Sequence, residues 1–262
     1  MNTPAPPITR DHDVAFNGHR LFAREWLPQP ANTQPPIILL HDSLGSTELW
    51  REFPEALCAA TGRRIIAYDR LGFGKSDTYP GAIDLNFVVT EWSGGLSAVL
   101  AALQVEDFIL FGHSVGGDMS VIAAAMLARC KGLITESAQA FAEDVTLDGV
   151  RRARTLFDDP VQMRRLKKYH GEKAPWVVSS WIDSWLSPAF ADWTLAPWLA
   201  KVTCPVLALH GDADEYGSRK HPEMIGALAA GPSQILIVPN CGHVPHREQP
   251  RAVLQAVGHF LA

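Results

Sequence analysis

The chain alternates between short apolar runs and longer segments with helical periodicity. Six runs rich in isoleucine, leucine and valine have the character of buried strands: Ile37–His41, Arg64–Asp69, Phe108–His113, Gly132–Glu136, Pro205–His210 and Gln234–Pro239. An opening hairpin from Asp13 to Leu27, turned at Asn17-Gly18, adds two strands. Helical patterns separate most runs: Thr47–Thr61, Asp84–Leu103, Val115–Arg129, Arg219–Ala230 and Arg251–Leu261. This order predicts an α/β fold with a mostly parallel, twisted sheet of about eight strands and helices on both faces.

One long interval interrupts this alternation. Residues 138–199 contain no convincing strand pattern and are divided by prolines, which is typical of several short helices. We therefore expect a core made of residues 1–137 and 200–262, with a helical segment of residues 138–199 inserted after the sixth strand. The insertion holds five of the eight tryptophans: Trp176, Trp181, Trp185, Trp193 and Trp198. These rings either pack the insertion onto the core or line an apolar pocket.

Composition narrows the classes of partner. A net charge of -5 over 262 residues supplies no field that would hold nucleic acid, so none is expected as a partner. No apolar stretch reaches the roughly 18 residues that span a bilayer, and the first 13 residues lack the apolar core of a signal peptide. We expect a loose N-terminal arm and a cytoplasmic protein without a membrane partner. The oligomeric state cannot be predicted.

The cysteines give no sign of a metal or disulfide framework. All four are far apart and form no C-x-x-C pair: Cys58, Cys130, Cys204 and Cys241. Buried free thiols are the better interpretation. Accordingly, neither a metal nor another cofactor is expected.

A candidate nucleophile lies where a strand passes into a helix. The strand FILFG leads into HSVGG and then into an apolar helix, so the G-x-S-x-G pattern around Ser114 stands at a strand-to-helix turn. Gly112 and Gly116 remove side chains that would collide in so tight a turn. The helix that begins at Val115 directs unpaired N–H groups toward the reacting centre. This context favours a nucleophile over a serine in an ordinary turn.

A serine nucleophile requires a base and an acid that orients the base. Among ten histidines, His243 follows the last strand and emerges at the same edge of the sheet as Ser114, and His246 is the alternative. The acid should follow the preceding strand, where GDADEY offers Asp212, Asp214 and Glu215. The order along the chain is then serine, acid, histidine.

At this point the motifs resemble the α/β-hydrolase superfamily over nearly the whole chain. The similar segments are HDSLG, DRLGFGKSD, GHSVGG, GDAD and GHVPHREQP. The resemblance implies Asp214, the fourth residue of G-x-x-D, as the acid and His243 as the base, with Asp212 second. It also implies that residues 138–199 form a helical cap. The cap segment KKYHGEKAPWVVSSWIDSWL is somewhat similar to the valacyclovir hydrolase group, but Val115 replaces the aspartate that holds a substrate amine there, so a preference for amino acid esters is not supported.

The resemblance implies a serine hydrolase that acts on a small to medium carboxylic ester, or a related thioester or lactone. The backbone N–H groups of Ser43 and Val115 would form the oxyanion hole, and Trp181 and Trp185 are expected to contact the small-molecule substrate. Three alternatives that keep the same three residues are a cofactor-free dioxygenase, a carbon-carbon bond hydrolase and a lyase. A further alternative is a non-catalytic ligand receptor, because fold does not fix function.

Asp42 is the unusual residue of this pattern, because glycine commonly follows the histidine in similar proteins. Aspartate tolerates unusual φ values and can bond to its local backbone, so it can keep the turn. A carboxylate that faced the developing oxyanion would oppose its charge. We therefore expect the Asp42 side chain to point away from Ser114 and to pin the loop while Ser43 presents its N–H.

Overall fold

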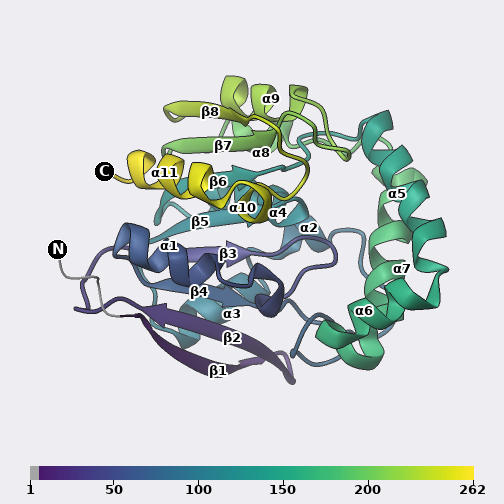
Figure 1. Cartoon of the computed structure of the whole chain (residues 1–262), viewed down its shortest axis with the longest axis horizontal. Coiled ribbons are helices and arrows are strands. Elements are labelled where there is room, and N and C mark those ends of the chain that lie inside the picture. The colour runs from purple at the N-terminus through teal and green to yellow at the C-terminus, as the bar shows by residue number, and fades with distance from the viewer. Residues whose placement is uncertain (1–5) are drawn as a thin grey trace.

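The computed structural model describes residues 6–262 and contains one eight-stranded sheet (Figure 1). The strand order is β1-β2-β4-β3-β5-β6-β7-β8. The strands are β1 Ile8–Phe16, β2 His19–Leu27, β3 Ile37–Leu40, β4 Ile65–Tyr68, β5 Phe108–His113, β6 Cys130–Glu136, β7 Val206–Gly211 and β8 Ser233–Val238. β1 and β2 are antiparallel to each other and β2 is antiparallel to β4, whereas all other neighbours are parallel. The predicted fold class is confirmed.

The N-terminal hairpin is longer than predicted. Residues 8–13, expected to belong to a loose arm, form the first part of β1 and pair with β2, while residues 1–5 lie outside the described part of the chain. The expectation failed because residues 8–13 carry no apolar alternation and are mostly exposed. Their pairing is supported across the strands, where Asp11 lies opposite Arg24 and accepts its hydrogen bonds.

Two predicted helices are each divided in the structure. The helical elements are η1 Thr47–Trp50, α1 Phe53–Thr61, α2 Phe87–Thr90, α3 Gly95–Ala102, α4 Val115–Met126, α5 Asp144–Phe157, α6 Pro160–His170, η2 Gly171–Lys173, α7 Ala174–Trp185, η3 Pro188–Phe190, α8 Ala196–Leu199, α9 Lys220–Leu228, α10 Pro245–Glu248 and α11 Pro250–Phe260. The expected helix 47–61 breaks at Arg51, whose φ is 53°. The expected helix 84–103 is interrupted between α2, which ends at Thr90, and α3, which begins at Gly95. At Gly95 a Cβ would lie 2.4 Å from the Glu91 carboxylate, so the chain can pass this close only with glycine.

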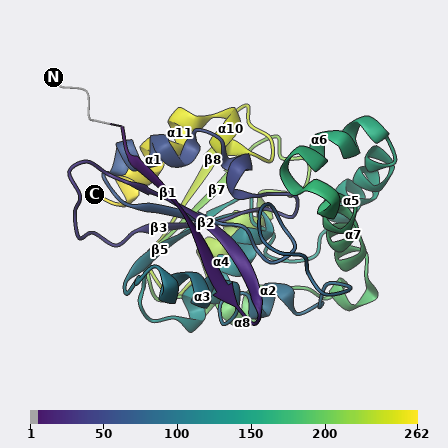
Figure 2. The same cartoon turned by 90° about the horizontal axis from the view of Figure 1, so that it is seen from below.

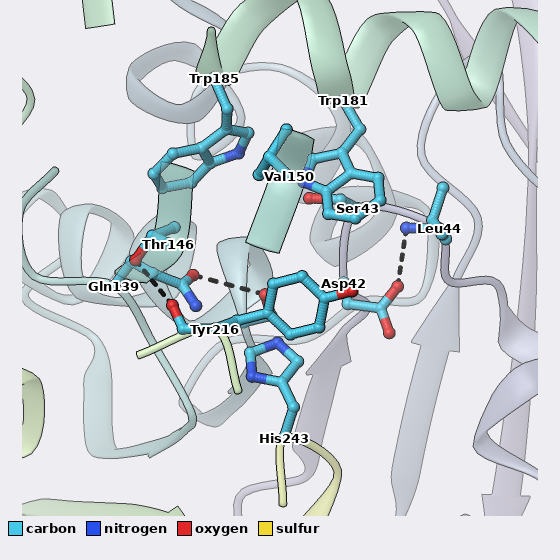
Figure 3. Close-up of a pocket in the computed structure, with 11 residues that line it drawn as sticks. Asp42, Ser43, Leu44, Gln139, Thr146, Val150, Trp181, Trp185, Tyr216 and His243 are labelled. Atoms are coloured by element: carbon cyan, nitrogen blue, oxygen red, sulfur yellow. Dashed lines mark hydrogen bonds between the residues drawn. The ribbon is translucent and has the colours of Figure 1, made fainter. Parts of the chain in front are cut away.

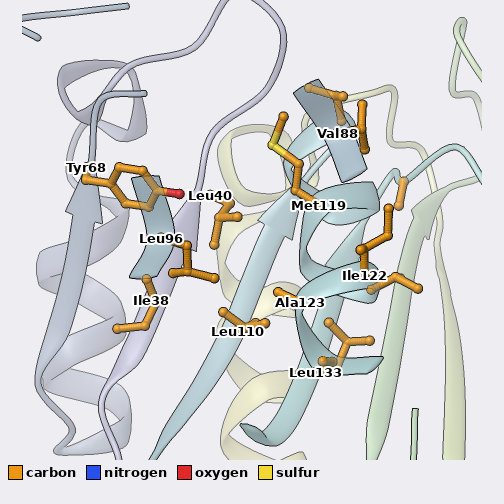
Figure 4. Packing of buried hydrophobic residues seen from close by; sticks show 14 of the residues in the cluster. Ile38, Leu40, Tyr68, Val88, Leu96, Leu110, Met119, Ile122, Ala123 and Leu133 are labelled. Carbon is orange, nitrogen blue, oxygen red and sulfur yellow. The ribbon is translucent and has the colours of Figure 1, made fainter. Parts of the chain in front are cut away.

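Helices cover both faces of the sheet (Figure 2). On one face, α1 and α11 bury a cluster that includes Leu57, Phe111 and Val257. On the other face, α3 and α4 pack against the strands (Figure 4). Because the parallel strands are covered on both faces, they carry continuous apolar runs instead of alternating ones, and this is why they could be recognised in the sequence.

Helices α5, α6 and α7 stand together beyond one end of the sheet (Figure 1). They belong to residues 138–199, and the parallel strands point their carboxyl ends toward them. The short helix α8 lies in the same range but packs against α4, with Leu199 in the main core. The helical character of this range follows the prediction, and its bounds as a separate cap stay a prediction.

Within residues 6–262, no helix is both long and apolar enough to cross a bilayer. The cysteines are free thiols; three are buried and Cys204 is partly buried.

Candidate active site

Ser114 occupies a strained turn between β5 and α4. Its φ is 54° and its ψ is -128°, values that a residue with a side chain rarely adopts. A Cβ on Gly112 would lie 2.1 Å from the carbonyl oxygen of Gly116, and one on Gly116 would lie 2.1 Å from that of Leu40. The two glycines therefore allow the helix to approach the strands closely enough for the turn to form. The strand-turn-helix geometry expected of G-x-S-x-G is present.

His243 and Asp214 form a buried pair. The Nδ1 atom of His243 lies 2.9 Å from both carboxylate oxygens of Asp214, whose side chain is inaccessible to solvent. The backbone N–H of Tyr216 also donates to this carboxylate at 2.8 Å. Burial alone would raise the pKa of Asp214, but the charge and hydrogen bond of His243 outweigh it and lower the pKa to about 2. An ionised Asp214 keeps the proton of His243 on Nδ1 and leaves Nε2 as an acceptor.

The alternative acid and base, Asp212 and His246, have other partners in the structure. Asp212 accepts a hydrogen bond from the backbone of Cys241 instead of from a histidine. His246 is buried, and its Nδ1 lies 2.5 Å from Glu136. His243 is thus the histidine that combines a carboxylate partner with a place in the cavity beside Ser114.

The hydroxyl of Ser114 donates to the Gln139 side-chain oxygen at 3.4 Å. Within residues 6–262, His243 Nε2 has no hydrogen-bond partner, so the serine-histidine bond of the proposed triad is not formed in this state. Catalytic hydrogen bonds are often long before substrate binds. Gln139 was missed by the sequence analysis, because it lies in a segment after β6 with no motif to mark it.

The loop after β3 is held from behind by His41 and Arg70. His41 donates from Nδ1 to the carbonyl of Asp42 at 2.8 Å, and Arg70 Nη2 donates to the same oxygen at 2.7 Å. Burial and the Arg70 charge lower the pKa of His41 well below its ordinary value. In the described part of the chain, the N–H groups of Ser43 and Val115 donate to no protein acceptor. Ser43 also lines the cavity beside Ser114, whereas Val115 is buried at the start of α4.

Asp42 bonds to its own loop, as the sequence analysis expected. One carboxylate oxygen accepts the N–H of Leu44 at 2.8 Å (Figure 3), and the other lies 3.2 Å from His113 Nδ1. The sequence did not indicate the partnership with His113. This contact lies beside the loop after β3 that carries Ser43.

A cavity of about 110 Å³ joins these groups. Its wall consists of Asp42, Ser43, Leu44, Ser114, Gln139, Thr146, Val150, Trp181, Trp185, Tyr216 and His243. Trp181 and Trp185, the residues expected to contact substrate, extend from α7 over the cavity (Figure 3). The Tyr216 ring lies 4.9 Å from the His243 ring. Thr146, Val150 and Tyr216 had no distinguishing signal beyond helical spacing or closeness to Asp214 in the sequence.

A model of the alpha/beta hydrolase family matches residues 37–256. The chain belongs to the α/β hydrolase family. Solved structures of this fold are similar to this α/β hydrolase over most of its length. A proline iminopeptidase of Mycobacterium smegmatis superposes with a TM-score of 0.78 at 22% identity, covering 96% of this chain and 97% of that one. The enol-lactonase of Burkholderia xenovorans gives a TM-score of 0.75 at 19% identity, covering 95% and 99%. At these identities the likeness concerns the fold alone.

Curated relatives of this α/β hydrolase differ in activity. A proline iminopeptidase of Lactiplantibacillus plantarum is 34% identical over 109 residues, which is 42% of this chain and 37% of that protein. A probable lysophospholipase of Arabidopsis thaliana is 29% identical over 119 residues, or 44% of this chain and 23% of that protein. These two matches thus span well under half of either relative. A 2-hydroxy-6-oxo-2,4-heptadienoate hydrolase of Pseudomonas putida is 25% identical over 250 residues, covering 87% and 89%.

Proposed function

We propose that this α/β hydrolase cleaves a small carboxylic ester, or a related thioester or lactone, through an acyl-enzyme on Ser114. The observation that carries the proposal is the meeting, in one cavity, of a serine on a strained turn and a histidine bonded to a buried, ionised aspartate. A serine that served only structure would need neither the strain nor the pair.

In the proposed mechanism, His243 Nε2 takes the hydroxyl proton as Ser114 Oγ attacks the ester carbonyl. Asp214 holds the imidazole tautomer and stabilises its protonated form. The proton then passes to the leaving alcohol as the carbon-oxygen bond breaks. A water molecule repeats the sequence on the acyl-enzyme and releases the acid.

The tetrahedral intermediate needs donors for its oxyanion. The backbone N–H groups of Ser43 and Val115 are the proposed donors, because both lack a protein acceptor. Val115 is the first residue of α4, so the positive end of that helix supports the same charge.

The size of the cavity favours the small end of the predicted substrate range. An apolar cavity of about 150 Å³ accommodates benzene. The 110 Å³ found here therefore favours a small acyl group. The indoles of Trp181 and Trp185 favour an apolar group in this position. We propose a small-molecule ester as the partner.

Labelling with a fluorophosphonate probe tests this proposal. We expect a single adduct on Ser114, hydrolysis of p-nitrophenyl acetate and butyrate, and loss of both in Ser114→Ala. An unlabelled Ser114 together with absent ester turnover would refute the hydrolase mechanism and favour a ligand receptor.

A second candidate is hydrolysis of a carbon-carbon bond next to a carbonyl. One observation favours it: the relative from Pseudomonas putida that matches nearly end to end is a 2-hydroxy-6-oxo-2,4-heptadienoate hydrolase. Parallel assays of a vinylogous 1,5-diketone and of p-nitrophenyl butyrate distinguish the two. Faster turnover of the diketone would replace the ester proposal.

A further inference from the structure

His113 precedes Ser114, but its ring lies against those of Trp50 and His246 and is not part of the cavity wall. Its side chain is 2% exposed. Nδ1 lies 3.2 Å from a carboxylate oxygen of Asp42, and Nε2 lies 2.8 Å from the backbone carbonyl oxygen of His243. One side chain thus contacts both loops that the proposed function uses: the loop that presents Ser43 and the loop that carries the base.

Both partners of the His113 ring can only accept hydrogen bonds. A carbonyl oxygen and an ionised carboxylate have no proton to donate, whereas a neutral imidazole carries one N–H and one lone pair. A neutral His113 would therefore direct one nitrogen lone pair of a buried ring at an oxygen lone pair, whether that oxygen belongs to His243 or to Asp42, whose side chain is 32% exposed. Beside an ionised Asp42, only the doubly protonated ring donates to both oxygen atoms.

His113 also lies near Glu136 and His246, and one ligand atom of each falls within 4.8 Å of the others. The spacing resembles a metal centre, but the contacts are those of hydrogen bonds. His246 Nδ1 lies only 2.5 Å from Glu136, and both nitrogens of His113 are already directed at oxygen atoms. His246 and Glu136 are therefore bonded to each other, and His113 is directed at the two loops.

We propose that His113 is a buried imidazolium that holds the Ser43 loop and the His243 loop in their relative positions, with Asp42 as its counter-ion. This role rests on the proposed function of the site. His113 acts as a positioning residue, since it reaches the reaction through the backbone of the two loops. Asp42, its counter-ion, also lines the cavity.

The electrostatics around His113 support this charge state. The charged or titratable groups that face His113 are Asp42, Glu136, His243 and His246. Burial alone would lower the pKa of His113, but the hydrogen bond and charge of Asp42, with the charge of Glu136, raise it to about 9. Burial would raise the pKa of Asp42, yet His113 holds it well below its ordinary value.

The direction of the pH dependence follows from the raised pKa. A histidine whose folded-state pKa exceeds its ordinary value of about 6.5 contributes fully below that value and loses its effect as the pH rises through the folded-state pKa. The bridge between the loops should thus be intact at neutral pH and open as the pH passes about 9.

Profiles of kcat and KM against pH, for Asp42→Asn and the native protein, test the proposal. Asparagine keeps the shape of the Asp42 side chain but removes its charge. At pH 8, His113 with a pKa of about 9 is about 90% charged in the native protein. In Asp42→Asn, a histidine with the ordinary pKa would be about 3% charged, so kcat should fall by up to about 30-fold. In Asp42→Asn we expect the alkaline limb of the kcat profile to move to lower pH, with a smaller change in KM.

Asp107→Asn is the matched control, because Asp107 is an exposed carboxylate paired with Lys131. An alkaline limb at the same pH in Asp42→Asn and the native protein would overturn the proposal.

Nitrogen NMR of histidine-labelled protein tests the charge without any turnover. In Ser114→Ala at pH 8, both ring nitrogens of His113 should be protonated, and in Ser114→Ala with Asp42→Asn the ring should be neutral. A neutral His113 in the first protein would refute the ion pair whether or not the enzyme cleaves esters. An imidazolium in a protein that hydrolyses no ester would sustain the ion pair and refute the proposed function instead.

Discussion

Trp181 should set the upper limit on the acyl group. Its indole lines the 110 Å³ cavity from α7 and is only half-buried, so removing it opens the cavity without emptying the core. Each methylene that a pocket admits or rejects is worth about 1–3 kcal/mol, or about 10- to 200-fold in discrimination. Hexanoate has two methylenes more than butyrate. Trp181→Ala should thus raise the hexanoate-to-butyrate ratio of kcat/KM by at least about 10²-fold.

The assay is hydrolysis of p-nitrophenyl esters from acetate to octanoate, with kcat/KM measured for each. Trp198→Ala is the matched control, because Trp198 is also half-buried but lies on α8 outside the cavity wall. It should leave the ratio unchanged. A native enzyme that prefers octanoate to acetate, or a Trp181→Ala variant with the native ratio, would refute the argument from cavity size.

Three further predictions concern the triad and the turn. Asp214→Asn should lower kcat for p-nitrophenyl butyrate by about 10⁴-fold, because the amide favours the wrong tautomer of His243. A loss of less than tenfold would contradict this role of Asp214. The pKa of Asp214 is about 2, below its ordinary value near 4, so the ionised carboxylate contributes to the free energy of unfolding. This contribution is fully present above pH 4 and is lost as the pH falls through 2. The free energy of urea unfolding of Asp214→Asn should therefore depend less on pH between 4 and 2 than that of the native protein. Gly116→Ala should sharply lower the melting temperature, because its Cβ would lie 2.1 Å from the Leu40 carbonyl oxygen. Gly258→Ala is the control and should not lower it, because a Cβ there would meet no atom within 4 Å. Equal melting temperatures of the two variants would show that the turn tolerates a side chain.

The amino-acid sequence by itself determined the elements and the candidate chemistry of this protein. Strands buried on both faces of a parallel sheet are continuous apolar runs, which can be read without knowing their neighbours. The nucleophile could be predicted because the strained turn at Ser114 depends on residues two positions away on each side. The choice of Asp214 required the family motif, since Asp212 has the same local character.

Only the tertiary structure decided the features that depend on contacts between residues distant in the chain: two element boundaries, the cavity wall and the contacts of His113. The break at Arg51 and the early start of β1 arise from packing and cross-strand pairing that local pattern does not show. Gln139 reaches Ser114 across 25 positions, and the 110 Å³ cavity is lined in part by side chains from α5 and α7. His113 bonds to His243 across 130 positions, and its contact with Asp42 joins the ends of two strands. The charge of a buried histidine follows from which atoms surround it, and those neighbours exist only once the sheet has assembled.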